Sequence, residues 1–176
     1  PLFDELTEEQ KSHPDALVTQ AGFELAAARY NQALVTLGKL IELYPNVSQH
    51  HYMLSKAYAG LGDMEQFSAE LQRTVELDPE HFYAKIALAR LALLSNRMDT
   101  FEKQLTELRR IAPENVDVQK LEVALAQRNG NNEIAVQLLE SILSREPTAT
   151  NVIALAAHKH SVGNISGAIE QLQRWV

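Results

Sequence analysis

Six histidines are the residues of this 176-residue sequence that could most readily bind a metal ion. His158 and His160 are two residues apart, so on a helix their side chains diverge by about 200° and cannot share one ion. His50 and His51 are adjacent and diverge by about 100°. A helical zinc site prefers histidines at i and i+4, a spacing that none of the six has. All six are therefore predicted to be surface or turn residues.

Known catalytic signatures are missing from the sequence. It contains no G-x-S-x-G, no G-x-x-x-x-G-K-[ST] and no H-E-x-x-H. Gly60-x-Gly62 resembles part of a nucleotide-binding loop, but a third glycine and a preceding strand are absent, so a turn between helices is predicted. With 0 cysteines, thiolate zinc sites and disulfides are excluded. We expect a protein that is not an enzyme and that carries no cofactor or metal ion.

Composition favours a helical protein with an interior of apolar side chains. The chain is 45% hydrophobic and contains 7 Gly and 6 Pro, too few turn formers for a β-sandwich or barrel. Its formal charge of −7 disfavours nucleic-acid binding, which needs clustered Lys and Arg. No apolar run reaches the roughly 18 residues that span a bilayer, and no signal peptide is visible.

Prolines recur at a regular interval that marks where the predicted helices end. Pro45, Pro79, Pro113 and Pro147 follow one another at a constant interval of thirty-four positions, and Pro14 precedes them by an interval three positions shorter. Other residues keep a fixed distance from the last four prolines. Twelve before stand Ala33, Phe67, Phe101 and Ala135; eight before stand Leu37, Leu71, Leu105 and Leu139; five before stand Leu40, Thr74, Leu108 and Ile142. These distances place the residues on one face of a helix that the proline ends.

An earlier helix completes each unit. Small residues at Ala21, Ser55 and Ala89 would let this helix approach the second one closely. Between the two helices, Gly or Asn suits the left-handed conformation that ends a helix, and a following Asp or Asn caps the next helix. These turns are predicted at Ala28-Arg29, Gly62-Asp63, Asn96-Arg97, Gly130-Asn131 and Gly163-Asn164. Each unit is therefore a helix, a tight turn, a second helix and a proline.

With these features the chain resembles the tetratricopeptide repeat family, most clearly in LSKAYAGLGDMEQFSAELQRTVELDP, residues 54–79. The resemblance implies an all-α, right-handed superhelical solenoid of antiparallel helix pairs with about five repeats. Phe67 and Phe101 depart from the family pattern, which has small residues there, and should alter local packing angles. We expect repeats at 14–47, 48–81, 82–115 and 116–148, a truncated repeat at 149–176, and a second helix of a preceding repeat or an N-terminal cap at 1–13.

One face of the first helices is the candidate binding surface. Positions −30, −27, −23 and −20 relative to each proline share that face, because they alternate between steps of three and four along a helix. Lys56 and Arg90 occupy equivalent places in adjacent repeats, and tyrosines are favoured anchors of interfaces. The predicted partner-binding groove contains Gln49, Tyr52, Lys56, Tyr83, Ile86, Arg90, Leu93, Lys120 and Gln127. The alternative is that Tyr52 and Ile86 pack between repeats while Lys56 and Arg90 are solvated.

The main hypothesis is a non-enzymatic protein-interaction scaffold that binds a partner peptide or helix, which could carry acidic groups, in this groove. Two alternatives stay open: self-association through repeat edges, supported by the core-type residue Trp175 near the end of the chain, and an RNA-binding superhelix. Trp175 also leads us to expect a fragment of a longer array. The segments YNQALVTLGKLIELYPN and LEVALAQRNGN resemble bacterial repeat arrays, including lipoproteins of exosortase (PEP-CTERM) systems. That likeness implies a role in exopolysaccharide export in the periplasm or at the outer membrane; without it, a cytoplasmic location is expected.

Overall fold

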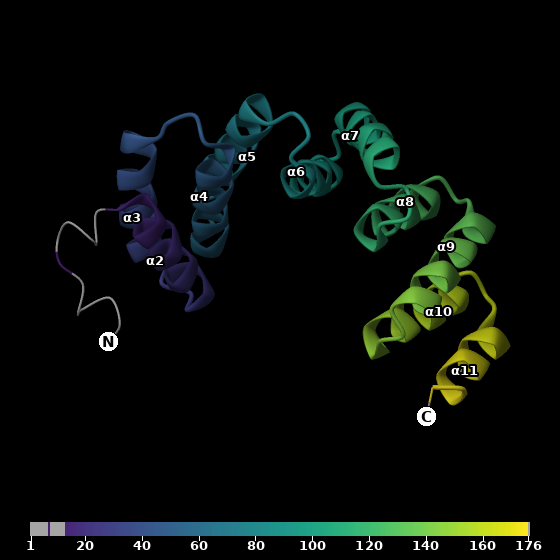
Figure 1. Cartoon of the computed structure of the whole chain (residues 1–176). Coiled ribbons are helices and arrows are strands. Elements are labelled where there is room, and N and C mark those ends of the chain that lie inside the picture. Colours follow the sequence, from purple (N-terminus) through teal and green to yellow (C-terminus); the bar gives the residue numbers. More distant parts are fainter. Residues whose placement is uncertain (1–6, 8–12, 176) are drawn as a thin grey trace. The chain divides into compact units, whose positions relative to one another are not determined.

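A computed structural model describes residue 7 and residues 13–175, and it confirms the predicted all-helical fold of paired helices (Figure 1). The described residues contain no strand. The chain divides into two compact units, Pro1–Asn96 and Arg97–Val176. The first contains α2 (Pro14–Ala26), α3 (Tyr30–Leu43), α4 (Ser48–Leu61), α5 (Met64–Leu77) and α6 (Phe82–Leu94). The second contains α7 (Met98–Ile111), α8 (Val116–Arg128), α9 (Asn132–Arg145), α10 (Ala149–Ser161) and α11 (Ile165–Gln173). The helix expected within 1–13 falls outside the described residues.

Local chemistry sets the helix ends as predicted. All five turn positions have positive φ, at 54° for Ala28, 76° for Gly62, 56° for Asn96, 72° for Gly130 and 84° for Gly163. The helices α3, α5, α7 and α9 each end two residues before a proline of the repeat, because proline disfavours helical geometry in the residue before it. The predicted side-chain caps form at Asp63 and Asn164 but not at Asn131.

The periodic face of the second helices lies in the core. All but one of the residues at its three positions per repeat are buried. The buried residues are Ala33, Leu37, Leu40, Leu71, Thr74, Phe101, Leu105, Leu108, Ala135, Leu139 and Ile142. Phe67 is the exception, because it is half-buried against the cluster of Leu71 and Leu88. The small residues Ala21, Ser55 and Ala89 are each 0% exposed, as close approach of the paired helices requires.

Three of the six histidines are buried, so the prediction that all six lie at the surface or in turns is wrong for these three. His50, His51 and His158 are all buried on the inner side of first helices. The Nδ1 atom of His51 lies 2.7 Å from Oε2 of Glu70 on α5, and its Nε2 atom lies 3.0 Å from the carbonyl oxygen of Pro45. These contacts compensate for the removal of the imidazole from water and connect α4 to α5 and to the preceding loop.

One glycine marks a close contact between neighbouring repeats. Gly60, in the last turn of α4, lies under the ring of Tyr30 from α3, and a Cβ atom at this position would be 2.3 Å from the ring carbon Cζ. Gly38, inside α3, has open space around it. Gly38 and Gly60 therefore differ in their surroundings and should respond differently to the same substitution.

We expect Gly38→Ala to raise the free energy of unfolding by about 0.5–1 kcal/mol, because alanine lowers the entropy cost of fixing the helix. Gly60→Ala should lack this gain, because its methyl group displaces the Tyr30 ring. In a Tyr30→Ala background, Gly60→Ala should regain it. Urea denaturation of the four variants measures these differences; equal gains for Gly38→Ala and Gly60→Ala in the unmodified background would contradict the contact.

Burial of His50 should make stability depend on pH. Burial, more than the nearby His51, lowers the pKa of His50 below 6.5, although a backbone hydrogen bond at Tyr44 opposes the shift. His50 therefore binds a proton more readily in the unfolded chain than in the folded one. The contribution of neutral His50 to the free energy of unfolding is present above pH 6.5 and is lost as the pH falls toward the pKa of the folded state. Between pH 7 and pH 5, the free energy of unfolding should fall less in the His50→Gln variant than in the unmodified chain. Denaturation curves across this range test the difference, and parallel losses in both proteins would refute it.

Candidate groove on the first helices

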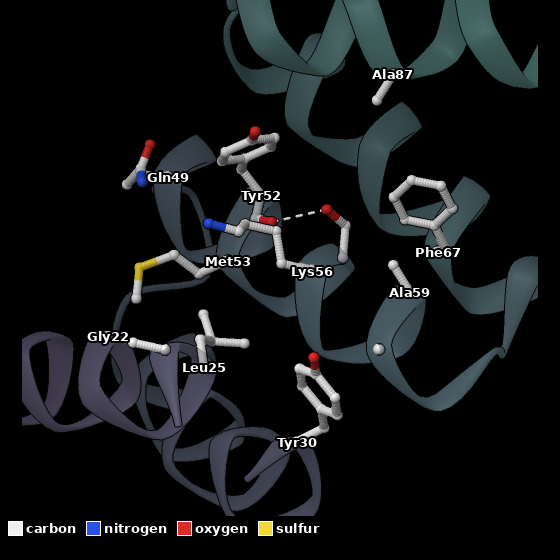
Figure 2. A pocket seen from close by; sticks show the side chains of 13 residues that line it. Gly22, Leu25, Tyr30, Gln49, Tyr52, Met53, Lys56, Ala59, Phe67 and Ala87 are labelled. Carbon is white, nitrogen blue, oxygen red and sulfur yellow. Dashed lines mark hydrogen bonds between the residues drawn. The ribbon is translucent and has the colours of Figure 1, made fainter. Parts of the chain in front are cut away.

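A groove of about 680 Å³ lies on the first-helix side of the N-terminal unit (Figure 2). Its lining comes mainly from α2 and α4, with single residues from α3, α5 and α6. Figure 2 shows the ring of Tyr52 at one end and the ring of Tyr30 at the other, with Phe67 on a further side. Gln49, Tyr52 and Lys56, three of the predicted partner-binding residues, line this groove together.

Tyr52 is the centre of the polar end of the groove. The Lys56 ammonium nitrogen is 6.0 Å from the centroid of the Tyr52 ring, and the His81 ring centroid is 4.7 Å from it. The side-chain oxygen of Gln49 is 3.5 Å from Nε2 of His81. Lys56 is exposed and has no carboxylate partner among the described residues. This end of the groove therefore offers a cation beside an aromatic face.

Tyr52 also interacts electrostatically with Tyr83 and Arg90, two residues of α6. Burial, followed by the nearby Tyr83 hydroxyl, raises the pKa of Tyr52 above 10.0, while the Arg90 guanidinium opposes the shift. Tyr52 therefore stays neutral at physiological pH, and its hydroxyl remains a hydrogen-bond donor. Tyr83 and Arg90 lie near the groove without lining it.

The other predicted residues of α6 differ in accessibility. Tyr83 is 59% exposed and Arg90 is exposed, but Leu93 is half-buried and Ile86 only 3% exposed. Ile86 therefore cannot offer its side chain to a partner, which corrects its inclusion in the binding surface. The reason is geometric, because a spacing of three and four residues places Ile86 at the margin between the open face of α6 and its packed face.

Lys120 and Gln127 belong to the C-terminal unit and already have intramolecular partners. The Lys120 ammonium is 3.7 Å from a carboxylate oxygen of Glu146. The Gln127 amide nitrogen is 3.2 Å from Nδ1 of His158. Both side chains are exposed, so these contacts tie first helices to neighbouring segments without closing the surface around them.

Several residues of the groove, chiefly Tyr30, Met53 and Phe67, were not predicted from the sequence. Tyr30 and Phe67 come from second helices, which were assigned wholly to packing. A usable signal for Tyr30 is the glycine at position 60, because a glycine inside a helix often marks the close approach of another group.

The lining of the groove combines aromatic and aliphatic side chains with the polar groups of Gln49, Ser55 and Lys56. Within the part of the chain that the structure describes, no group of three or more His, Cys, Asp or Glu side chains could hold a metal ion. In that same part, each helix is too short or too polar to cross a bilayer.

Comparisons with solved structures show the fold. MamA from Desulfovibrio magneticus (residues 41 to the end) matches with a TM-score of 0.76 and 16% identity over 92% of each chain. A tetratricopeptide repeat protein from Parabacteroides merdae matches with a TM-score of 0.75 and 14% identity, covering 92% of this chain and 63% of its own. YrrB, a TPR protein with an unusual peptide-binding site, matches with a TM-score of 0.70 and 14% identity, covering 99% of this chain and 91% of its own.

No curated protein matches the chain significantly. Family models do: two models, each for the tetratricopeptide repeat, match residues 15–46 and 52–116 and together cover more than half of the sequence. The matched ranges contain the left-handed turns at Ala28, Gly62 and Asn96 and the prolines Pro45, Pro79 and Pro113. The chain therefore belongs to the tetratricopeptide repeat family, whose fold is that of a protein–protein interaction scaffold.

Proposed function

We propose that this chain is a non-enzymatic scaffold that binds a partner peptide in the groove of its N-terminal unit. The observation that carries the proposal is Lys56, an exposed cation with no described carboxylate partner, held beside the Tyr52 ring on the wall of an open groove. YrrB, whose fold is similar, has a peptide-binding site. Its likeness supports a peptide as the class of ligand.

The groove favours a peptide that combines an acidic group with an apolar side chain. Its carboxylate would approach Lys56 from the solvent side, where Arg90 adds a second positive charge near Tyr52. Its apolar side chain would pack between Tyr30 and Phe67 and displace water from both rings. The opposite charges would orient the peptide and speed its association, while the aromatic contacts would supply most of the affinity.

For the biological setting we infer assembly or export in a bacterial envelope, which the resemblance of residues 30–46 and 121–131 to bacterial repeat arrays implies. A peptide library samples ligands of this class without an assumed pathway.

We expect a peptide library selected against this chain to yield sequences that share an acidic residue near an apolar one. The Lys56→Glu/Arg90→Glu variant should bind them roughly tenfold more weakly or worse, because both cations are reversed at the ligand's carboxylate. Fluorescence anisotropy of the enriched peptides measures the affinity.

The matched control is Lys39→Glu/Lys103→Glu, which changes the net charge equally at exposed positions of second helices that do not line the groove. It should retain the affinity of the unmodified chain. Circular dichroism checks that both variants are folded. Equal binding by the two double variants would show that the peptides bind elsewhere.

A further inference from the structure

His81 connects the N-terminus of α6 to the polar end of the groove. It is the N-cap of α6, and the backbone N–H of Ala84 donates a hydrogen bond to its Nδ1 atom over 3.2 Å. The half-buried ring also packs against the Tyr52 ring, with the centroids 4.7 Å apart. These two contacts fix the direction of the other ring nitrogen, Nε2, which lies 3.5 Å from the side-chain oxygen of Gln49.

The position of the proton on His81 follows from these contacts. A backbone N–H can only donate, so Nδ1 must accept from Ala84 and carries no proton in the neutral ring. The proton of neutral His81 is therefore on Nε2, and it is donated to the Gln49 oxygen. Because the amide of Gln49 has one oxygen and one NH₂ group, a bond that engages the oxygen also sets where the NH₂ group points.

The NH₂ group of Gln49 is turned toward the groove. In Figure 2 the amide nitrogen lies on the side of Met53 and Lys56, and the oxygen points away from both. Gln49 is exposed and lines the groove, and its NH₂ group has no partner among the described residues. The groove therefore offers two kinds of donor, a charged ammonium at Lys56 and a neutral amide at Gln49.

The two donors suit different oxygen atoms of a peptide. The Lys56 ammonium attracts a carboxylate, because both groups are charged. The neutral Gln49 amide matches the neutral carbonyl of a peptide bond. In a helix most of these carbonyls are already bonded within the helix, whereas an extended segment leaves them available.

We propose that Gln49 donates a hydrogen bond to a backbone carbonyl of an extended peptide, and that His81 is a positioning residue that keeps the Gln49 amide in the required orientation. The inference rests on the proposed function, because it concerns the same ligand in the same groove. It adds a main-chain contact to the side-chain contacts of Lys56, Tyr30 and Phe67.

The chain itself supplies a conservative substitution and a matched control. Asn115, at the position equivalent to His81 in the next repeat, caps α8 with its side-chain oxygen. His81→Asn should therefore keep α6 capped, but the shorter side chain cannot hold the Gln49 oxygen. His13, at the equivalent position two repeats earlier, caps α2 through Nδ1, 3.4 Å from the backbone nitrogen of Asp15, and does not line the groove. His13→Asn makes the same change away from Gln49.

The first test is an anisotropy titration of the whole chain with the fluorescein-labelled peptide that binds most tightly in the library selection. We expect Gln49→Ala to weaken binding about fivefold and His81→Asn about threefold, because each affects one neutral hydrogen bond. In the Gln49→Ala background, His81→Asn should have no further effect, since its action passes through the amide. His13→Asn should bind like the unmodified chain. Additive losses, or equal losses in the two histidine variants, would overturn the role of His81.

Gln49→Glu tests the donor itself, because it replaces only the NH₂ group by oxygen. It is titrated with a form of the same peptide in which the acidic residue is changed to its amide, so that the new carboxylate meets no like charge. Binding should again weaken about fivefold relative to the unmodified chain. Unchanged binding would show that Gln49 does not donate to a backbone carbonyl.

NMR of the free chain separates this inference from the proposed function. Two-bond ¹H–¹⁵N correlations locate the imidazole proton of His81, and at about pH 8, where an imidazole is ordinarily neutral, we expect it on Nε2. A proton on Nδ1 would overturn the inference whether or not peptides bind. Peptides that depend on Lys56 and Arg90 but not on Gln49 would leave the proposed function standing and overturn this inference alone.

Discussion

The helices of this protein are stable because they pack closely in pairs. The described helices have 9–14 residues, a length at which an isolated helix is marginal in water. Each must bury one face against a neighbour, and the fully buried Ala21, Ser55 and Ala89 allow the backbones to approach. The prolines and left-handed turns fix where each helix ends, so the same packing recurs in each repeat.

The division of faces that follows from this packing produces the functional surfaces. The inner side of a first helix is used for stability, which is why His51 and His158 are buried there with polar partners. The side that remains open carries Tyr52 and Lys56 in the N-terminal unit. The same packing rule therefore separates the residues that stabilise a helix pair from those that line the proposed peptide groove.

Much of the fold could be predicted from the sequence because its determinants are local. Proline removes a backbone donor and Gly or Asn accepts positive φ, so the helix ends could be predicted to within a few residues. The residues of the groove were harder to predict from the sequence, because the groove depends on contacts between repeats. Spacing alone could not tell that Ile86 is packed while Tyr83 is open, nor that Tyr30 reaches from a second helix over Gly60.

Peptide binding to the open side of α2 and α4 can be observed residue by residue by NMR. Backbone amide signals of the ¹⁵N-labelled chain would be followed during titration with a selected peptide. We expect saturable shifts concentrated at Gly22, Gln49, Lys56 and Ala59, with little change in the outward residues of α3 and α5. Shifts confined to those second helices, or to α10 and α11, would contradict it.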